Sequence, residues 1–108
     1  MKTENVILIT SLTATGTITK NRFVTYGGAQ AGAGVAVAGV SDDNVVAGEM
    51  FGNKARGWMI VEAGAAVAQG AAVESDASGR AITLNTGVQA GRAIDAAAAA
   101  GVPIRIDR

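Results

Sequence analysis

The sequence predicts an all-β fold, either a sandwich or a small barrel of short strands, with at most one short helical turn. Strand-like segments recur at the spacing of about 8–12 residues that is typical of such folds. Residues 61–80 (VEAGAAVAQGAAVESDASGR) are interrupted by Gly64, by Gly70 and by a turn-forming cluster at Ser75–Gly79. Because glycine costs about 1 kcal/mol in a helix interior, this stretch is expected to form extended segments joined by tight turns.

The N-terminal segment contains a compact run of β-branched residues and leucine. Asn5–Thr10 (NVILIT) is rich in β-branched residues and has four consecutive apolar side chains, which therefore occupy both faces of a strand. A strand of this kind is either central in a sheet or pairs with another chain. The threonine-rich residues Ser11–Thr19 fit a second strand or an extended arm.

Turn signals divide the rest of the first half into short strands. Thr19–Arg22 (TKNR) and Ser41–Asn44 (SDDN) contain Asn and Asp residues that favour turns. The strands expected between them are Arg22–Tyr26 and Val35–Val40, joined by the glycine-rich loop Gly27–Gly34.

The second half begins with the heaviest strand and continues with a hairpin. Ala55–Glu62 (ARGWMIVE) carries large apolar side chains on both faces and is expected to anchor the core. Ala71–Ser75 and Arg80–Leu84 are predicted to pair across the turn Asp76–Gly79.

The C-terminal region contains the one helical signal. Gly91 in the strand Val88–Asp95 indicates a bulge or a close backbone approach. Asp95–Gly101 (DAAAAAG) has a capping residue, good helix formers and a terminating glycine, which predict one or two helical turns. Val102–Ile106 alternates apolar and outward residues, and Pro103 places this segment at an edge or at a strand start.

Composition limits both the size of the core and the class of function. The 108 residues suffice for one domain, and 49% are hydrophobic but only 4% aromatic, so small side chains fill much of the core. We therefore expect subunit contacts to supply part of the stability. The formal net charge is zero, which argues against direct nucleic-acid binding. No apolar run reaches the ~18 residues of a membrane span, so no membrane association is expected.

The side chains that most often carry catalysis are absent. The chain has no cysteine and no histidine, which excludes disulfides, thiolate chemistry and the usual proton carrier near neutral pH. The loop GGAQAGAG lacks the Lys-Ser or Lys-Thr of a phosphate-binding loop. We expect no enzyme activity, no cofactor, and no catalytic or metal-binding residue. The neighbouring carboxylates are assigned to turns: Asp42, Asp43, Glu74 and Asp76. The aromatic side chains are assigned to the core rather than to a ligand groove: Phe23, Tyr26, Phe51 and Trp58.

The order of residues in the second half resembles a known family. Glu62–Gly70 (EAGAAVAQG) is followed by Ala71–Ala81 (AAVESDASGRA), then by Gly91–Ile94 and finally by Ile104–Ile106. This arrangement is similar to the small bacteriophage capsid cement proteins, also called head decoration proteins. The sequence departs from the family pattern at Ala71, where aspartate is common, a change that affects a turn and not the fold.

The resemblance implies a structural protein of the virion. Family members bind the outside of the expanded icosahedral head, commonly as trimers at three-fold or quasi-three-fold positions, and reinforce it against internal DNA pressure. Their core is a small β-barrel or β-tulip. The implied partners are the major capsid protein and further copies of the chain, and the implied location is the outer capsid surface after synthesis in the host cytoplasm. Two other virion roles stay open, a tail or baseplate β-module and a carbohydrate-binding adhesin domain.

We expect residues 1–12 to form an extended capsid-binding arm and residues 13–108 to form a single β domain. An extended strand can add to a partner's sheet through backbone hydrogen bonds, and many copies on a symmetric lattice gain avidity. The capsid contacts are expected at Asn5, Val6, Ile7, Leu8, Ile9 and Thr10.

Overall fold

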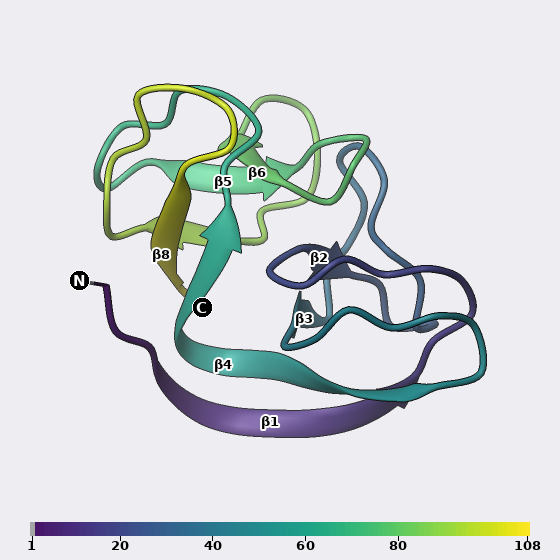
Figure 1. Cartoon of the computed structure of the whole chain (residues 1–108). Coiled ribbons are helices and arrows are strands. Elements are labelled where there is room, and N and C mark those ends of the chain that lie inside the picture. Colours follow the sequence, from purple (N-terminus) through teal and green to yellow (C-terminus); the bar gives the residue numbers. More distant parts are fainter. Residues whose placement is uncertain (1) are drawn as a thin grey trace.

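The computed structural model describes residues 2–108, in which the regular structure is all strand (Figure 1). The strands form one antiparallel eight-stranded sheet that is curled into a nearly closed barrel. The all-β fold class predicted from the sequence is therefore confirmed. The strands are β1 (Asn5–Thr13), β2 (Phe23–Val24), β3 (Gly39–Ser41), β4 (Met50–Glu62), β5 (Ala72–Ser75), β6 (Ala81–Thr83), β7 (Gly91–Ala93) and β8 (Pro103–Asp107).

The 13-residue strand β4 organises the sheet because it has neighbours along both edges. Asn53 is paired with Thr10 of β1 and with Ser41 of β3, so β1 and β3 lie on opposite sides of β4. Trp58 is likewise paired with β1 on one side and with β8 on the other. Figure 1 shows β1 running outside β4, and β1 has no strand partner on its other side in the described chain. β1 is therefore an edge strand.

The remaining strands curl the sheet back toward the end of β4. From β4 the order continues through β8, β7 and β5 to β6. A parallel bridge then joins Ala81 in β6 to Ala63, just after β4 ends, and the Gly64 amide donates to the Ala81 carbonyl at 2.8 Å. This contact nearly closes the barrel and leaves β1 outside the closed part.

Two apolar clusters fill the interior, and β4 contributes to both. The larger cluster lies inside the barrel and includes Met59 and Val61 of β4. The smaller cluster packs Phe51 of β4 with residues of the first half of the chain. Full burial of such side chains contributes about 1.5–3 kcal/mol each. The largest fully buried side chains of the larger cluster are Phe23, Val40, Met59, Val61, Val73, Ile104 and Ile106.

Several elements predicted from the sequence are confirmed. β5 and β6 form the predicted hairpin, and Asp76 holds its turn by accepting hydrogen bonds from the amides of Ser78 and Arg80, both at 2.8 Å. β8 starts at Pro103, the position where proline is tolerated in a strand. The predicted close approach at Gly91 is also present, because a Cβ there would lie 2.9 Å from the Asp107 carbonyl oxygen.

The predicted helical turn at Asp95–Gly101 is wrong. Ala97 instead exchanges two backbone hydrogen bonds with Val67, at 2.8 and 2.9 Å, and its side chain packs in the larger core. The carboxylate of Asp95 binds Arg105 and does not cap a helix. A run this short has too few helical hydrogen bonds to outweigh these tertiary contacts.

Strand lengths in the first half also differ from the prediction. β1 ends at Thr13, so most of Ser11–Thr19 is not a strand, and β2 retains only Phe23–Val24 of the predicted Arg22–Tyr26. Most of Val35–Val40 is irregular, and only its last two residues belong to β3. Alternation of valine with alanine marked this segment as extended, but pairing depends on a neighbouring strand that the local pattern does not reveal.

The aromatic residues divide evenly between core and surface. Phe23 and Phe51 are buried as predicted, whereas Trp58 is 44% exposed and Tyr26 is 68% exposed. The pleat of β4 explains Trp58, because Met59 and Val61 face the core and the alternate side chains face outward.

Candidate functional site

The edge strand β1 is held against β4 by an irregular register. Asn5 is opposite Trp58 and Thr13 is opposite Met50, with bulges between Val6 and Ile9. Gly57 of β4 faces these bulges with φ +114°, and a Cβ there would lie 2.5 Å from the Asn5 carbonyl oxygen. Only glycine fits this approach, and the bulges bend the edge of the sheet.

The bulged part of β1 presents consecutive apolar side chains to the surface. Ile7 is 82% exposed, Leu8 47% and Ile9 56%. Exposed apolar side chains are ordinary when scattered, but three in a row on an edge strand mark an interaction surface. Of the predicted contact residues, Asn5 and Thr10 are exposed as well, whereas Val6 is half-buried and packs against the larger core.

A shallow apolar hollow of about 210 Å³ runs beside β1. Leu8, Thr10 and Leu12 line it from β1, as expected for alternate residues on one face. Asn53 of β4 joins two other lining residues, because its side-chain amide donates to Thr10 Oγ1 at 3.2 Å and to the Ala38 carbonyl at 3.3 Å. The remaining lining residues are Tyr26, Ala38, Ala55 and Arg56.

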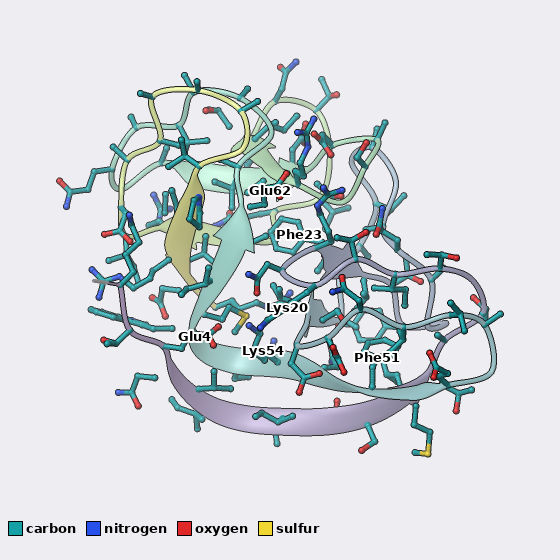
Figure 2. The ribbon with its side chains drawn as sticks, in the orientation of Figure 1. Glu4, Lys20, Phe23, Phe51, Lys54 and Glu62 are labelled. Atoms are coloured by element: carbon teal, nitrogen blue, oxygen red, sulfur yellow. The ribbon has the colours of Figure 1, made fainter. Side chains whose placement is uncertain are left out.

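An ion pair with the buried Lys54 ties the residues before β1 to β4. Glu4 Oε2 accepts hydrogen bonds from Lys54 Nζ at 2.5 Å and from the Ile60 amide at 2.8 Å. Figure 2 shows Glu4 and Lys54 together at the bend of β4. Residues 4–12 of the predicted arm therefore lie on the sheet, paired from Asn5 onward and anchored at Glu4.

Arg105 of β8 supports the exposed indole next to this surface. Its guanidinium carbon lies 5.6 Å from the centroid of the Trp58 ring, a cation–π distance. The same guanidinium donates to both carboxylate oxygens of Asp95, at 2.9 and 3.0 Å. This side-chain hydrogen bonding is the largest cause that lowers the pKa of Asp95 to about 2. Burial opposes the shift, while the Arg105 amide and the positive charges of Arg105 and Lys2 reinforce it.

Comparison with protein families identifies the family of this chain. A family model for the phage cement protein matches residues 1–108, the whole length of the sequence. The chain belongs to the phage cement protein family. Comparison with curated proteins and with solved structures gives no match. This cement protein is thus a structural, capsid-associated protein of the phage virion.

The carboxylates of the cement protein that were assigned to turns have backbone partners. Asp42 accepts from the Gly52 amide at 3.0 Å and Asp43 from the next amide at 2.8 Å. The assignment of Glu74 to a turn is wrong, because Glu74 is a buried residue of β5 whose carboxylate accepts from the distant Gly87 amide at 2.6 Å. Among residues 2–108, no group of three or more acidic, His or Cys side chains is arranged to hold a metal ion. Nor does this part of the chain contain a helix long and apolar enough to cross a membrane.

The sequence prediction of the surface missed residues that the fold brings to β1. Met50 and Trp58 flank its two ends from β4, and Tyr26 and Arg56 lie along its hollow. The alternation of Trp58 with two core residues was a usable signal for its exposure. Tyr26 and Arg56 carried no such signal, because only the pairing of distant segments places them there.

Proposed function

We propose that this cement protein binds the outer surface of the expanded icosahedral head through β1 and stabilises the shell. The observation that carries the proposal is the run of exposed apolar side chains Ile7, Leu8 and Ile9 on an edge strand with no partner on its outer side among residues 2–108. The predicted contact segment Asn5–Thr10 coincides with this run. The proposal involves no catalytic step.

The physical basis is apolar burial combined with strand addition. Covering a large apolar side chain contributes up to about 1.5–3 kcal/mol, and three neighbouring side chains supply a compact anchor. The outer edge of β1 also offers backbone donors and acceptors to a capsid strand. Because many copies act on one lattice, moderate affinity at each site suffices to strengthen the shell.

We further propose that the bound form is a trimer at three-fold or quasi-three-fold positions. Two features support self-association: the core is made largely of small side chains, and exposed apolar residues continue beyond β1 at Met50 and Trp58. Cryo-electron microscopy of the decorated head tests this part, since single copies located away from the three-fold and quasi-three-fold axes would contradict the trimer.

Point substitutions test the contact surface better than a truncation does. Removing residues 1–10 would also remove Glu4 and leave Lys54 as an uncompensated buried charge, so lost binding would have two explanations. The double variant Ile7→Asp/Ile9→Asp changes only exposed side chains. Val88→Asp is the matched control, because Val88 is similarly exposed in the loop before β7.

The assay is co-sedimentation with expanded shells that lack the cement protein. We expect the double variant to bind about tenfold more weakly or worse, because each aspartate must be desolvated against an apolar partner. Val88→Asp should bind like the parent, and circular dichroism should show both variants folded. Undiminished binding by the double variant would refute the role of β1.

A further inference from the structure

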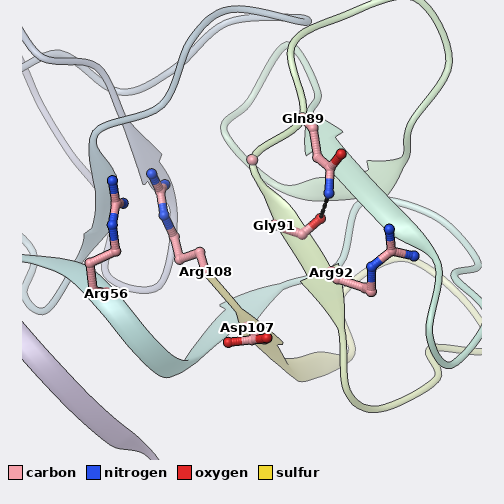
Figure 3. A pocket seen from close by; sticks show the side chains of 7 residues that line it. Arg56, Gln89, Gly91, Arg92, Asp107 and Arg108 are labelled. Carbon is pink, nitrogen blue, oxygen red and sulfur yellow. Dashed lines mark hydrogen bonds between the residues drawn. The ribbon is translucent and has the colours of Figure 1, made fainter.

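The arginine side chains divide into two sets. Arg22, Arg80 and Arg105 each lie within 4.0 Å of a carboxylate oxygen. Three others have no such partner among residues 2–108, and all three line the same hollow of about 470 Å³ on the β7–β8 side of the molecule (Figure 3). These residues are Arg56, Arg92 and Arg108, and the hollow is completed by Gln89, Ala90, Gly91 and Asp107.

Arg108, which lines this hollow, has side-chain donors without a hydrogen-bond partner in the described chain. Its Nη2 donates to the Val37 carbonyl at 3.0 Å, but its Nε and Nη1 are buried without a hydrogen-bond partner in the described chain. Burial lowers the pKa of Arg108, the charge of Arg56 lowers it further, and Tyr26 raises it. A buried charged donor without a partner is costly, so this arrangement favours an anion that supplies acceptors.

The geometry selects the kind of anion. Figure 3 shows the side chains of Arg56 and Arg108 extended side by side, with Arg92 on the other side of the hollow. Guanidinium groups bind carboxylates through paired, charge-assisted hydrogen bonds. The lining also contains Asp107, which disfavours a polyanion such as nucleic acid but leaves room for one negative group. The chain as a whole has no net positive charge to attract a polyanion.

We propose that Arg56, Arg92 and Arg108 form a carboxylate-binding site that receives an acidic side chain of the capsid protein. The identity of this occupant rests on the proposed function, whereas carboxylate binding itself does not. The argument for the capsid is continuity: Arg56 is opposite Leu8 in the β1–β4 register and also lines the apolar hollow beside β1. A partner that covers β1 therefore reaches Arg56, and the arginine site adds charge recognition to an otherwise apolar contact.

The first experiment tests carboxylate binding in the isolated protein. The Nε–Hε signals of the arginines are followed by NMR while acetate replaces chloride at constant ionic strength. We expect saturable shifts of the Arg108 and Arg56 signals, and about tenfold weaker acetate binding in Arg56→Gln. Lys20→Gln, a change at an exposed side chain outside the hollow, should leave the titration unchanged.

Two outcomes of this titration would overturn the site. Shifts that are absent, or that are the same in Arg56→Gln as in the parent, would show that the arginines do not bind carboxylates. If inorganic phosphate binds more tightly than acetate, the preferred ligand of the site is a phosphate group and the carboxylate proposal is wrong.

The second experiment tests the occupant with expanded shells. Arg56→Gln and Arg92→Gln should each weaken co-sedimentation about tenfold at about 50 mM NaCl, with a smaller difference at about 200 mM, because salt screens the lost charge pair. Normal binding of Arg56→Gln together with failure of Ile7→Asp/Ile9→Asp would overturn this inference and leave the role of β1 intact. If Arg56→Gln lowers self-association but binds shells normally, the carboxylate comes from a second copy of this protein. That result would overturn the capsid assignment.

Discussion

Glu4 is the ion-pair partner of the buried Lys54, with 2.5 Å between Oε2 and Nζ. Lys54 lies in the middle of β4 and is 3% exposed, so its charge depends on a residue that precedes the first strand. The pair therefore joins the N-terminal segment to the central strand, and it sets the position from which β1 starts.

Glu4→Gln should destabilise the protein through Lys54. Removal of one partner of a fully buried pair costs about 3–5 kcal/mol. Because the Glu4 side chain is 32% exposed, we expect a loss of about 2 kcal/mol here. Urea unfolding measures the loss. Glu49→Gln, at an exposed carboxylate outside any ion pair of residues 2–108, is the control and should change stability by less than about 0.5 kcal/mol.

A double variant separates the two explanations of such a loss. Glu4→Gln/Lys54→Met removes both charges, so it should recover part of the stability that Glu4→Gln loses. A double variant less stable than Glu4→Gln would show that packing around Lys54, and not its charge, is responsible.

Asp95 should titrate with a pKa of about 2 because Arg105 binds its charged form. Its pKa is lower in the folded state than the ordinary value of 3.8, so the pair stabilises the fold above about pH 4. This contribution is lost as the pH falls through about 2. NMR titration of the Asp95 side chain measures the value, and Arg105→Gln should move it toward 3.8. An unchanged pKa in that variant would contradict the assignment.

Gly57→Ala should disrupt the β1–β4 pairing. The backbone at Gly57 has φ +114°, and the added methyl group would collide with the backbone of β1. We expect the free energy of unfolding to fall by about 2 kcal/mol or more. Amide hydrogen exchange should accelerate relative to the parent more in β1 than in β8. Gly16→Ala is the matched control, since a Cβ there meets nothing within 4 Å. Equal stabilities of the two variants would show that β1 tolerates the methyl group.

The two kinds of aromatic position should respond differently to truncation. Phe23→Ala removes a fully buried ring from the larger core and should cost about 3–5 kcal/mol. Trp58→Ala removes a half-exposed ring and one cation–π contact and should cost about 1 kcal/mol. Thermal unfolding gives both values, and a larger loss for Trp58→Ala would contradict the assignment of this ring to the surface.

Local sequence signals were sufficient where the structure is local. The β5–β6 hairpin followed from turn residues between two short apolar segments, because Asp76 and its neighbours close the turn through their own hydrogen bonds. Pro103 and Gly91 were interpreted correctly for the same reason: each restricts its own backbone. The alanine run after Asp95 misled because the competing partners, Val67 and Arg105, are distant in the sequence.

Composition, turn spacing and the order of residues were sufficient to predict the fold class and the family, and the composition excludes His and Cys chemistry. The sequence also singled out Asn5–Thr10 as an unusual apolar strand. The pairing of distant strands makes this strand an edge with Ile7, Leu8 and Ile9 exposed. It also places three arginines without carboxylate partners among the described residues around one hollow. The physical reason is that exposure and charge pairing are properties of long-range strand pairing, which no local pattern encodes.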